Sequence, residues 1–332
     1  MTFNPKTSML RHSAIAACAF WPTDRQHIFF QDHDGGIRQI THKNGFVGGD
    51  KHSRLAIANN AKWHTPLAAA GYEVPCSQKD CSGNNRAARI HLFYLNAENF
   101  IRSVTFNGEF WVTATDFNKQ LIRVHPSSKL SVIAMYPSNV LRLYYQTEDK
   151  KLNEHIYTAE AGWLHQATLG AAITGSAIAA TAYPCRDEIS VFFQDASCTL
   201  RQIHKVDKDV WREGSLNIPG APPQCAFSAV SHTGLIWNMD IIRLHVVTGR
   251  KTVSEWVWYH SNNAFSEATD LSSSTLPHGN IAAIVYPKDE KEEVRFYFQG
   301  DHNEMLAIGL VAGTWEVLPM LSTGETSLYE TR

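Results

Sequence analysis

An internal repeat constrains the fold of this chain more than any other feature of its sequence. Three motifs return at a constant offset of 163 residues: Ser13-Ala-Ile-Ala-Ala17 as Ser176-Ala-Ile-Ala-Ala180, Phe29-Phe-Gln-Asp32 as Phe192-Phe-Gln-Asp195, and Arg38-Gln-Ile40 as Arg201-Gln-Ile203. Three matches in one register indicate a duplicated structural unit. Residues 14–20, which alone resemble a short signal peptide, belong to such a unit, so we predict a strand there.

Looser copies of the same pattern fill the chain. An apolar and aromatic stretch that ends in a polar turn begins at His27, His91, Arg142, Ser190, Arg243 and Arg295, at spacings of 48 to 64 residues. A strand of small apolar residues precedes each copy, around Ile15, Leu67, Leu130, Ile178, Phe227 and Ile281. Helical spacing of apolar residues is not sustained anywhere. Six all-β repeats of about 50 residues predict a six-bladed β-propeller with antiparallel four-stranded blades.

We therefore expect a single domain over residues 1–332, with repeats at approximately 10–62, 63–125, 126–172, 173–222, 223–276 and 277–325. The longer second spacing predicts a surface loop at residues 76–85. That segment contains Cys76 and Cys81, for which a disulfide and free thiols both remain open.

Composition narrows the possible partners. Thirty Lys and Arg face 32 Asp and Glu, so the formal net charge is −2, and no basic field indicates a nucleic-acid partner. No apolar run reaches the roughly 20 residues of a membrane span. Sixteen histidines occur without HExxH or a paired helical spacing, and the six cysteines lack CxxC, so we expect no metal site. We predict a cytoplasmic protein, and whether it forms a homodimer stays open.

At its repeated motifs the chain resembles the fungal fucose-specific lectins, which are six-bladed propellers. The resemblance implies that a sugar would lie between neighbouring blades. Arg and Glu of one blade would hydrogen-bond its hydroxyls, and aromatic rings of a neighbouring blade would pack on its apolar face.

Carried over by position, the Arg/Glu pair is intact only as Arg142 with Glu154 and as Arg243 with Glu255. The other repeats have His27 with Gln39, His91 with Ser103, Ser190 with Gln202, and Arg295 with Ala307. The aromatic position three residues further on holds His42, Phe106, Tyr157, Lys205, Trp258 and Leu310. A later Trp occurs as Trp111, Trp163, Trp211 and Trp315, with Phe46 and Phe265 in the other two repeats. Whether each pair meets the preceding or the following blade is open.

Structural roles compete with ligand binding at these positions. The Arg/Glu pairs could be cross-strand ion pairs, which contribute little to stability, and the Trp series could be inter-blade packing. Lys205 could be a solvated strand residue or a new cation in an inherited cleft.

Three function classes remain: a lectin with one or two weak sites, a propeller whose cavity serves another small molecule, and a structural platform. Because the six positions have diverged separately, we favour the second class. The chain is also similar to the fungal hetero-Diels–Alderases of tropolonic sesquiterpenoid pathways. We therefore predict a cofactor-independent enzyme that joins a tropolone or aromatic quinone methide to a sesquiterpene such as humulene.

The fourth repeat is the predicted wall of that site. We assign catalysis to Lys205 and His204, and substrate binding to Arg142, Glu154, Tyr157, Trp211, Arg243, Glu255 and Trp258. The alternative is a fucose-binding lectin with one or two weak inter-blade sites, whose partner would be a fucosylated glycan.

Overall fold

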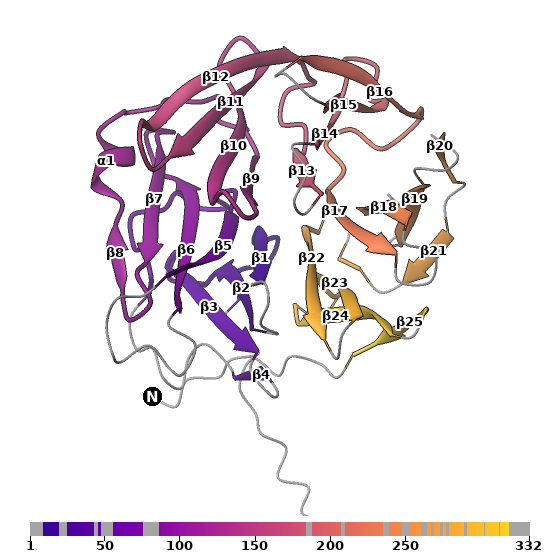
Figure 1. Ribbon diagram of the computed structural model, residues 1–332, viewed down its shortest axis with the longest axis horizontal. Coiled ribbons are helices and arrows are strands. Elements are labelled where there is room, and N and C mark those ends of the chain that lie inside the picture. Colours follow the sequence, from indigo (N-terminus) through magenta and orange to yellow (C-terminus); the bar gives the residue numbers. More distant parts are fainter. Residues whose placement is uncertain are drawn as a thin grey trace, which may run out of the picture.

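Six antiparallel sheets form a ring around a central axis in the computed structural model (Figure 1). The structure describes residues 9–19, 25–42, 46–47, 56–75, 86–183, 188–206, 210–234, 239–247, 252–259, 264–266, 269–272, 275–276, 279–288, 291–301, 303–311 and 313–318. The predicted all-β, six-bladed propeller is confirmed.

The first three sheets contain the residues of the first three repeats. Blade 1 comprises β1 (Ile15–Ala19), β2 (Gln26–Gln31), β3 (Ile37–His42) and β4 (Phe46–Val47). Blade 2 comprises β5 (Ala68–Pro75), β6 (Arg86–Leu95), β7 (Ile101–Phe106) and β8 (Trp111–Thr113). Blade 3 comprises β9 (Leu130–Met135), β10 (Val140–Gln146), β11 (Lys151–Thr158) and β12 (Gly162–Ala171).

The other three sheets continue around the ring in chain order. Blade 4 comprises β13 (Ala179–Ala182), β14 (Ile189–Gln194), β15 (Leu200–Lys205) and β16 (Trp211–Ile218). Blade 5 comprises β17 (Phe227–Gly234), β18 (Met239–Val247), β19 (Val253–Tyr259), β20 (Ala264–Phe265) and β21 (Thr269–Ser272). Blade 6 comprises β22 (Ile281–Lys288), β23 (Lys291–Gln299), β24 (Met305–Val311) and β25 (Thr314–Val317).

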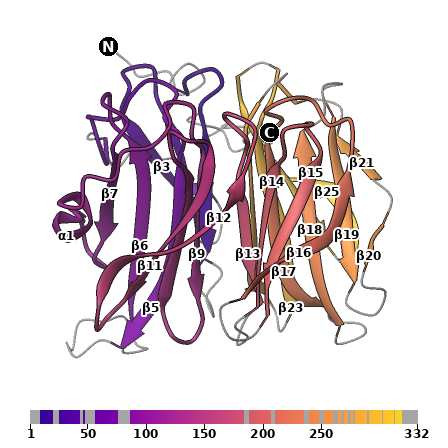
Figure 2. The same ribbon diagram turned by 90° about the horizontal axis from the view of Figure 1, so that it is seen from above.

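The first strand of each blade lies next to the axis, and the later strands follow outward (Figure 1). In the view at right angles to the central axis, the blades stand next to one another and their strands run roughly along that axis (Figure 2). The helix α1 (Thr115–Asn118) forms a single turn. Within the described part of the chain, no helix is both long and apolar enough to cross a bilayer.

The repeated motifs form one hydrogen-bonded unit in each duplicated blade. The hydroxyl of Ser176 accepts a bond from the backbone N–H of Gln194, and Ser13 makes the same contact with Gln31. The buried amide of Gln194 donates to the carbonyls of Cys198 and Pro222, and so joins its own turn to the start of the next blade. This network explains why the motifs recur in one register, because each member needs the others as partners.

Asp and Arg complete the same unit at the turn between the second and third strands. The Asp195 carboxylate accepts backbone N–H bonds from Ser197 and Thr199 and an Arg201 Nε bond at 2.9 Å. Asp32 and Arg38 repeat this arrangement in blade 1. Local side-chain bonds of this kind fix the turn that sets the strand register.

Apolar side chains of neighbouring blades pack together in six inter-blade cores. Phe93 of blade 2 packs with Leu143 and Trp163 of blade 3 in one of them. The core between blades 6 and 1 contains Tyr297 and Ile15 and closes the ring. Because every described blade consists of consecutive strands, the ring closes by side-chain packing and by bonds such as Asn303 Nδ2 to the Met9 carbonyl at 2.7 Å.

Two expectations concern the cysteines and the second repeat. The loop predicted at residues 76–85, with Cys76 and Cys81, lies outside the described residues. Among the described residues, Cys18, Cys198 and Cys225 are free thiols. The segment that resembles a signal peptide contributes β1, as the repeat predicts.

Candidate functional site

Each blade contributes side chains to two different clefts. Glu154 and Tyr157 lie three positions apart on β11, and side chains alternate between the two faces of a strand. An odd offset therefore places them on opposite faces. The Tyr157 ring lies 6.2 Å from the His91 ring of blade 2, whereas Glu154 bonds Tyr144, whose ring faces Trp211 of blade 4 at 6.3 Å.

The contacts also decide which neighbour completes each cleft. The indole N–H of Trp111 in blade 2 donates to Gln39 Oε1 of blade 1 at 3.0 Å. Trp315 of blade 6 likewise donates to Glu255 Oε2 of blade 5 at 3.1 Å. Each Arg/Glu position therefore meets the following blade, which resolves the choice that the sequence left open.

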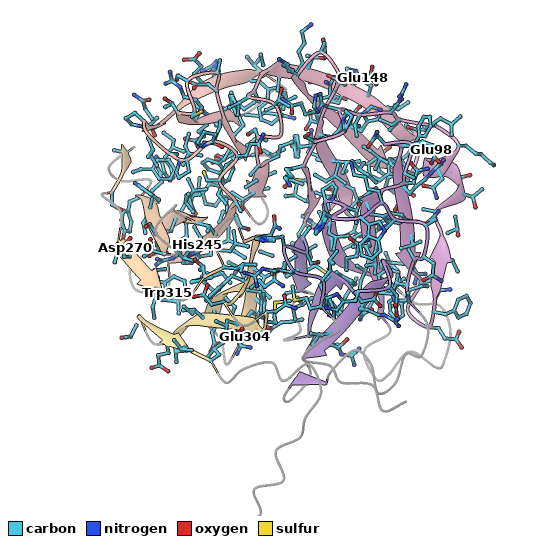
Figure 3. All side chains as sticks on the ribbon, turned by 180° about the vertical axis from the view of Figure 1, so that it is seen from behind. Glu98, Glu148, His245, Asp270, Glu304 and Trp315 are labelled. Atoms are coloured by element: carbon cyan, nitrogen blue, oxygen red, sulfur yellow. The ribbon has the colours of Figure 1, made fainter. Side chains whose placement is uncertain are left out.

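The cleft between blades 5 and 6 brings together the groups expected of a sugar site. Arg243 Nη1 donates to Glu255 Oε1 at 2.9 Å, and the Arg243 guanidinium lies 5.9 Å from the centre of the Trp315 ring. His245 follows Arg243 on the same face of β18, and its ring contacts Trp315 edge to face at 5.4 Å. Figure 3 labels His245 and Trp315, which lie close together on these blades.

Electrostatics keep this cleft charged. Burial alone would raise the pKa of the Glu255 carboxyl, but His245 and Arg243 beside it together lower that pKa to about 2. Burial lowers the pKa of the His245 imidazole, and the neighbouring Glu255 carboxylate opposes this shift. Arg243 Nε contacts His232 Nε2 at 3.0 Å, and this contact helps to orient the guanidinium. The cleft therefore presents a carboxylate acceptor and a guanidinium donor beside an indole ring.

The cleft between blades 3 and 4 has the same pair but is closed. Arg142 Nη1 and the Tyr144 hydroxyl both donate to Glu154 Oε1, each at 2.9 Å. Glu154 and Lys205 have no exposed surface, and Arg142 is 6% exposed. Lys205 lies on the same face of β15 as Ile203, and Ile203 packs in the core shared with blade 3. The Lys205 side chain therefore occupies the aromatic position of this cleft. Protein atoms therefore fill the place that a sugar would need.

Uncharged or internally paired groups occupy the remaining clefts. Gln39 takes the Glu position between blades 1 and 2, where its Nε2 contacts His27 Nδ1 at 2.6 Å. Between blades 2 and 3, His91 stacks on Tyr72 at 5.8 Å. Gln202 bonds Ser190 between blades 4 and 5 at 2.9 Å.

The cleft between blades 6 and 1 keeps its Arg without a matching Glu. Arg295 contacts Gln26 Oε1 at 3.3 Å and Glu293 at 3.5 Å, and it lies over the Tyr286 ring at 4.9 Å. The positions of Phe46 and His42 belong to this cleft, but their side chains lie outside the described ones.

The nine residues predicted to form one enzyme site are spread over four clefts. Arg142, Glu154, Lys205 and Trp211 lie between blades 3 and 4, and Arg243 with Glu255 lies between blades 5 and 6. Tyr157 faces blade 2, and Trp258 packs in the core of blades 4 and 5. His204 is adjacent to Lys205 on β15 and so points to the opposite face. The predicted pocket with Lys205 and His204 side by side is therefore not assembled.

The family comparison decides the class of protein. A model of the fungal fucose-specific lectins matches residues 9–317. The chain belongs to the fungal fucose-specific lectin family. A fucose-specific lectin from Aspergillus oryzae is 25% identical in an alignment of 285 positions that covers 83% of this chain and 84% of the relative. Another from Aleuria aurantia is 24% identical in an alignment of 335 positions that covers 96% of this chain and 98% of the relative.

A solved structure agrees. The six-bladed propeller of Aleuria aurantia lectin matches with a TM-score of 0.81 at 21% identity, over 97% of this chain and 100% of that chain. The predicted hetero-Diels–Alderase function is wrong, because the family and these relatives are fucose-specific lectins. The catalytic roles assigned to Lys205 and His204 fall with it.

Sequence reasoning did not include Trp315 or His245 among the site residues. Trp315 belongs to the repeated Trp series, and only its contact with the preceding blade distinguishes it. His245 lies two residues after Arg243 on one strand, and this period-of-two spacing could have shown that both share a face. Among the described residues, no cluster of three or more His, Cys, Asp or Glu could hold a metal ion.

Proposed function

We propose that this protein is a weak fucose-binding lectin whose principal site is the cleft between blades 5 and 6. One observation carries the proposal: Arg243, Glu255 and Trp315 converge there from two blades. Membership of the fucose-specific lectin family supports the choice of sugar.

The chemistry of the cleft suits a deoxy sugar. The ionised Glu255 carboxylate accepts bonds from sugar hydroxyls, and Arg243 donates to sugar oxygens, so both contacts are charge-assisted. The Trp315 ring offers an apolar surface to the methyl group and to the C–H face of the ring. A bound sugar exchanges the bond between Trp315 and Glu255 for bonds of its own.

Two features limit the affinity. Leu310 stands where the family pattern has an aromatic ring, so one stacking surface is missing. Stacking of this kind contributes about 0.5–1.5 kcal/mol, or roughly two- to tenfold in affinity. The buried Lys205 closes the cleft between blades 3 and 4, which leaves one principal site on each chain. With a single site, the protein lacks the avidity of a multivalent lectin.

Calorimetric titration with α-methyl-L-fucoside tests the proposal. We expect one site per chain for the wild type and at least a tenfold loss of affinity for Glu255→Gln, because a charge-assisted bond contributes about 1.5–3 kcal/mol. Glu316→Gln, at an exposed carboxylate on β25, serves as the matched control and should bind as the wild type does. Absence of binding to the wild type, or equal binding by Glu255→Gln, would contradict the proposal. A cytoplasmic location remains a prediction from the sequence.

A further inference from the structure

Among the described residues that line the central channel, Lys129 is the one Lys or Arg. A cavity of about 510 Å³ lies on the axis and is lined by the first strands of the blades and the residues just before them. Small-molecule sites commonly have volumes of about 300–1,000 Å³. This cavity is separate from the inter-blade clefts, whose Arg and Glu residues are not among its lining residues.

The repeat places six equivalent residues in a ring around this cavity. In each blade a residue one or two positions before the first strand lines the cavity, and these six residues are Ala14, Pro66, Lys129, Ala177, Ala226 and Asn280. Only Lys129 is charged. Among the described residues that line the cavity, none is Asp or Glu.

The hydrogen bonding of the Lys129 ammonium also differs from that of the nearby Lys62. Among the described residues, none accepts a hydrogen bond from it or pairs with it. Burial lowers the pKa of this amine. The nearby Lys62 instead donates to Asn99 Oδ1 at 2.9 Å and to the Pro126 carbonyl at 2.5 Å. Lys129 is therefore a half-buried residue that lines the cavity and has no acceptor among the described residues for its ammonium.

Backbone groups of the first strands, which form the wall of the cavity, provide further hydrogen-bond donors. Each first strand pairs along one edge only, so its other edge presents backbone groups toward the axis or the neighbouring blade. Small side chains such as Ala16, Ala68 and Ala179 leave this edge accessible in the cavity. His12 and His64 lie at the mouth, both in left-handed turns with φ of 60° and 54°.

We propose that the central channel binds a small organic carboxylate, with its charged group on Lys129. One fixed cation matches one negative charge, whereas phosphate at neutral pH would leave charge uncompensated in the channel. A bound carboxylate supplies the acceptor that Lys129 lacks, and backbone N–H groups of the first strands bond its oxygens. This binding does not depend on the fucose site.

Saturation-transfer NMR with benzoate, its neutral isostere benzamide and inorganic phosphate tests the proposal. We expect benzoate to bind the wild type more tightly than either of the others. Lys129→Met should weaken benzoate binding at least tenfold, since it keeps the side-chain length and removes the charge. Lys129→Arg should retain binding, and Lys119→Met, at an exposed lysine of similar charge, should be silent.

Circular dichroism and α-methyl-L-fucoside binding confirm that Lys129→Met is folded. Equal binding of benzoate and benzamide, unchanged binding by Lys129→Met, or tighter binding of phosphate would overturn the proposal. Displacement of benzoate by α-methyl-L-fucoside would also overturn it, because it would place benzoate in an inter-blade cleft. Loss of fucose binding alone would count against the lectin proposal and not against this one.

Discussion

The indole nitrogen of Trp315 lies 3.1 Å from a carboxylate oxygen of Glu255, which belongs to the preceding blade. Trp111 and Gln39 repeat this relationship four blades away in the chain, at 3.0 Å. The bond therefore joins blades whether or not the acceptor is charged. Only at Glu255 does it also involve a carboxylate that an Arg holds in place, so only there can a sugar exchange the inter-blade bond for charge-assisted contacts.

The first prediction concerns stability and pH. The pKa of Glu255 is about 2 in the folded protein against an ordinary 4.5, so the ionised carboxylate stabilises the fold above pH 4.5. This stabilisation is lost as the pH falls from 4.5 toward 2. We expect the difference in unfolding free energy between wild type and Glu255→Gln to shrink by up to about 3 kcal/mol over that range. Urea unfolding at several pH values measures it.

Glu316→Gln is the control for this series because its carboxylate is exposed. Its difference from the wild type should stay small and nearly constant with pH. A gap for Glu255→Gln that does not change between pH 6 and pH 2 would show that the carboxylate is not preferentially ionised in the fold.

The fold could be predicted because each repeat carries its own local determinants. Ser176, Gln194 and Asp195 all bond groups within one blade or at its junction with the next, so their spacing in the chain is fixed by short-range geometry. The candidate sugar site, in contrast, depends on contacts between residues that are far apart in the sequence. Glu255 and Trp315 are 60 residues apart, and no local pattern states which neighbouring blade a strand face meets.

The degree of burial of individual polar residues could not be predicted from the sequence either. Alternation along β15 predicts that Lys205 and His204 face opposite ways, and applying it would have excluded a shared pocket. The alternation does not predict that blade 3 covers Lys205 completely, because the extent of burial depends on how tightly the two blades pack. The same packing closes one Arg/Glu cleft and leaves Arg243 of the other partly exposed.

A second prediction separates the two surviving pairs. Glu154 is fully buried, so Glu154→Gln removes from the protein interior the carboxylate that pairs with Arg142. We expect the unfolding free energy to fall by about 3–5 kcal/mol, measured by urea unfolding at pH 7. Glu148→Gln breaks an exposed pair with Arg123, both 61% exposed, and should cost less than about 1 kcal/mol. Similar losses for the two variants would contradict the burial of the Arg142 pair.

The third prediction is a gain of function. Leu310→Tyr restores a ring at the aromatic position beside Trp315, its cross-strand partner. Stacking worth about 0.5–1.5 kcal/mol should raise the affinity for α-methyl-L-fucoside by roughly two- to tenfold, as measured by calorimetry. Leu164→Tyr, at a leucine that is 54% exposed on β12, should leave the affinity unchanged. The gain should disappear when Leu310→Tyr is combined with Glu255→Gln, and its persistence would place the sugar elsewhere.

The last prediction concerns the cost of the channel cation. Burial places the folded-state pKa of Lys129 below its ordinary 10.5, so the protonated amine destabilises the fold at all pH values below the folded-state pKa. Lys129→Met should therefore melt at a higher temperature than the wild type at pH 7.5, and the gap should narrow as the pH rises toward 10.5, where the unfolded lysine also loses its proton. Lys119→Met should show no such trend, because that lysine is 72% exposed. Benzoate should raise the melting temperature of the wild type and of Lys119→Met but not that of Lys129→Met, since only proteins that keep the Lys129 cation gain a partner for it. A wild type that is more stable than Lys129→Met at pH 7.5 without benzoate would mean that the ammonium already has a compensating partner.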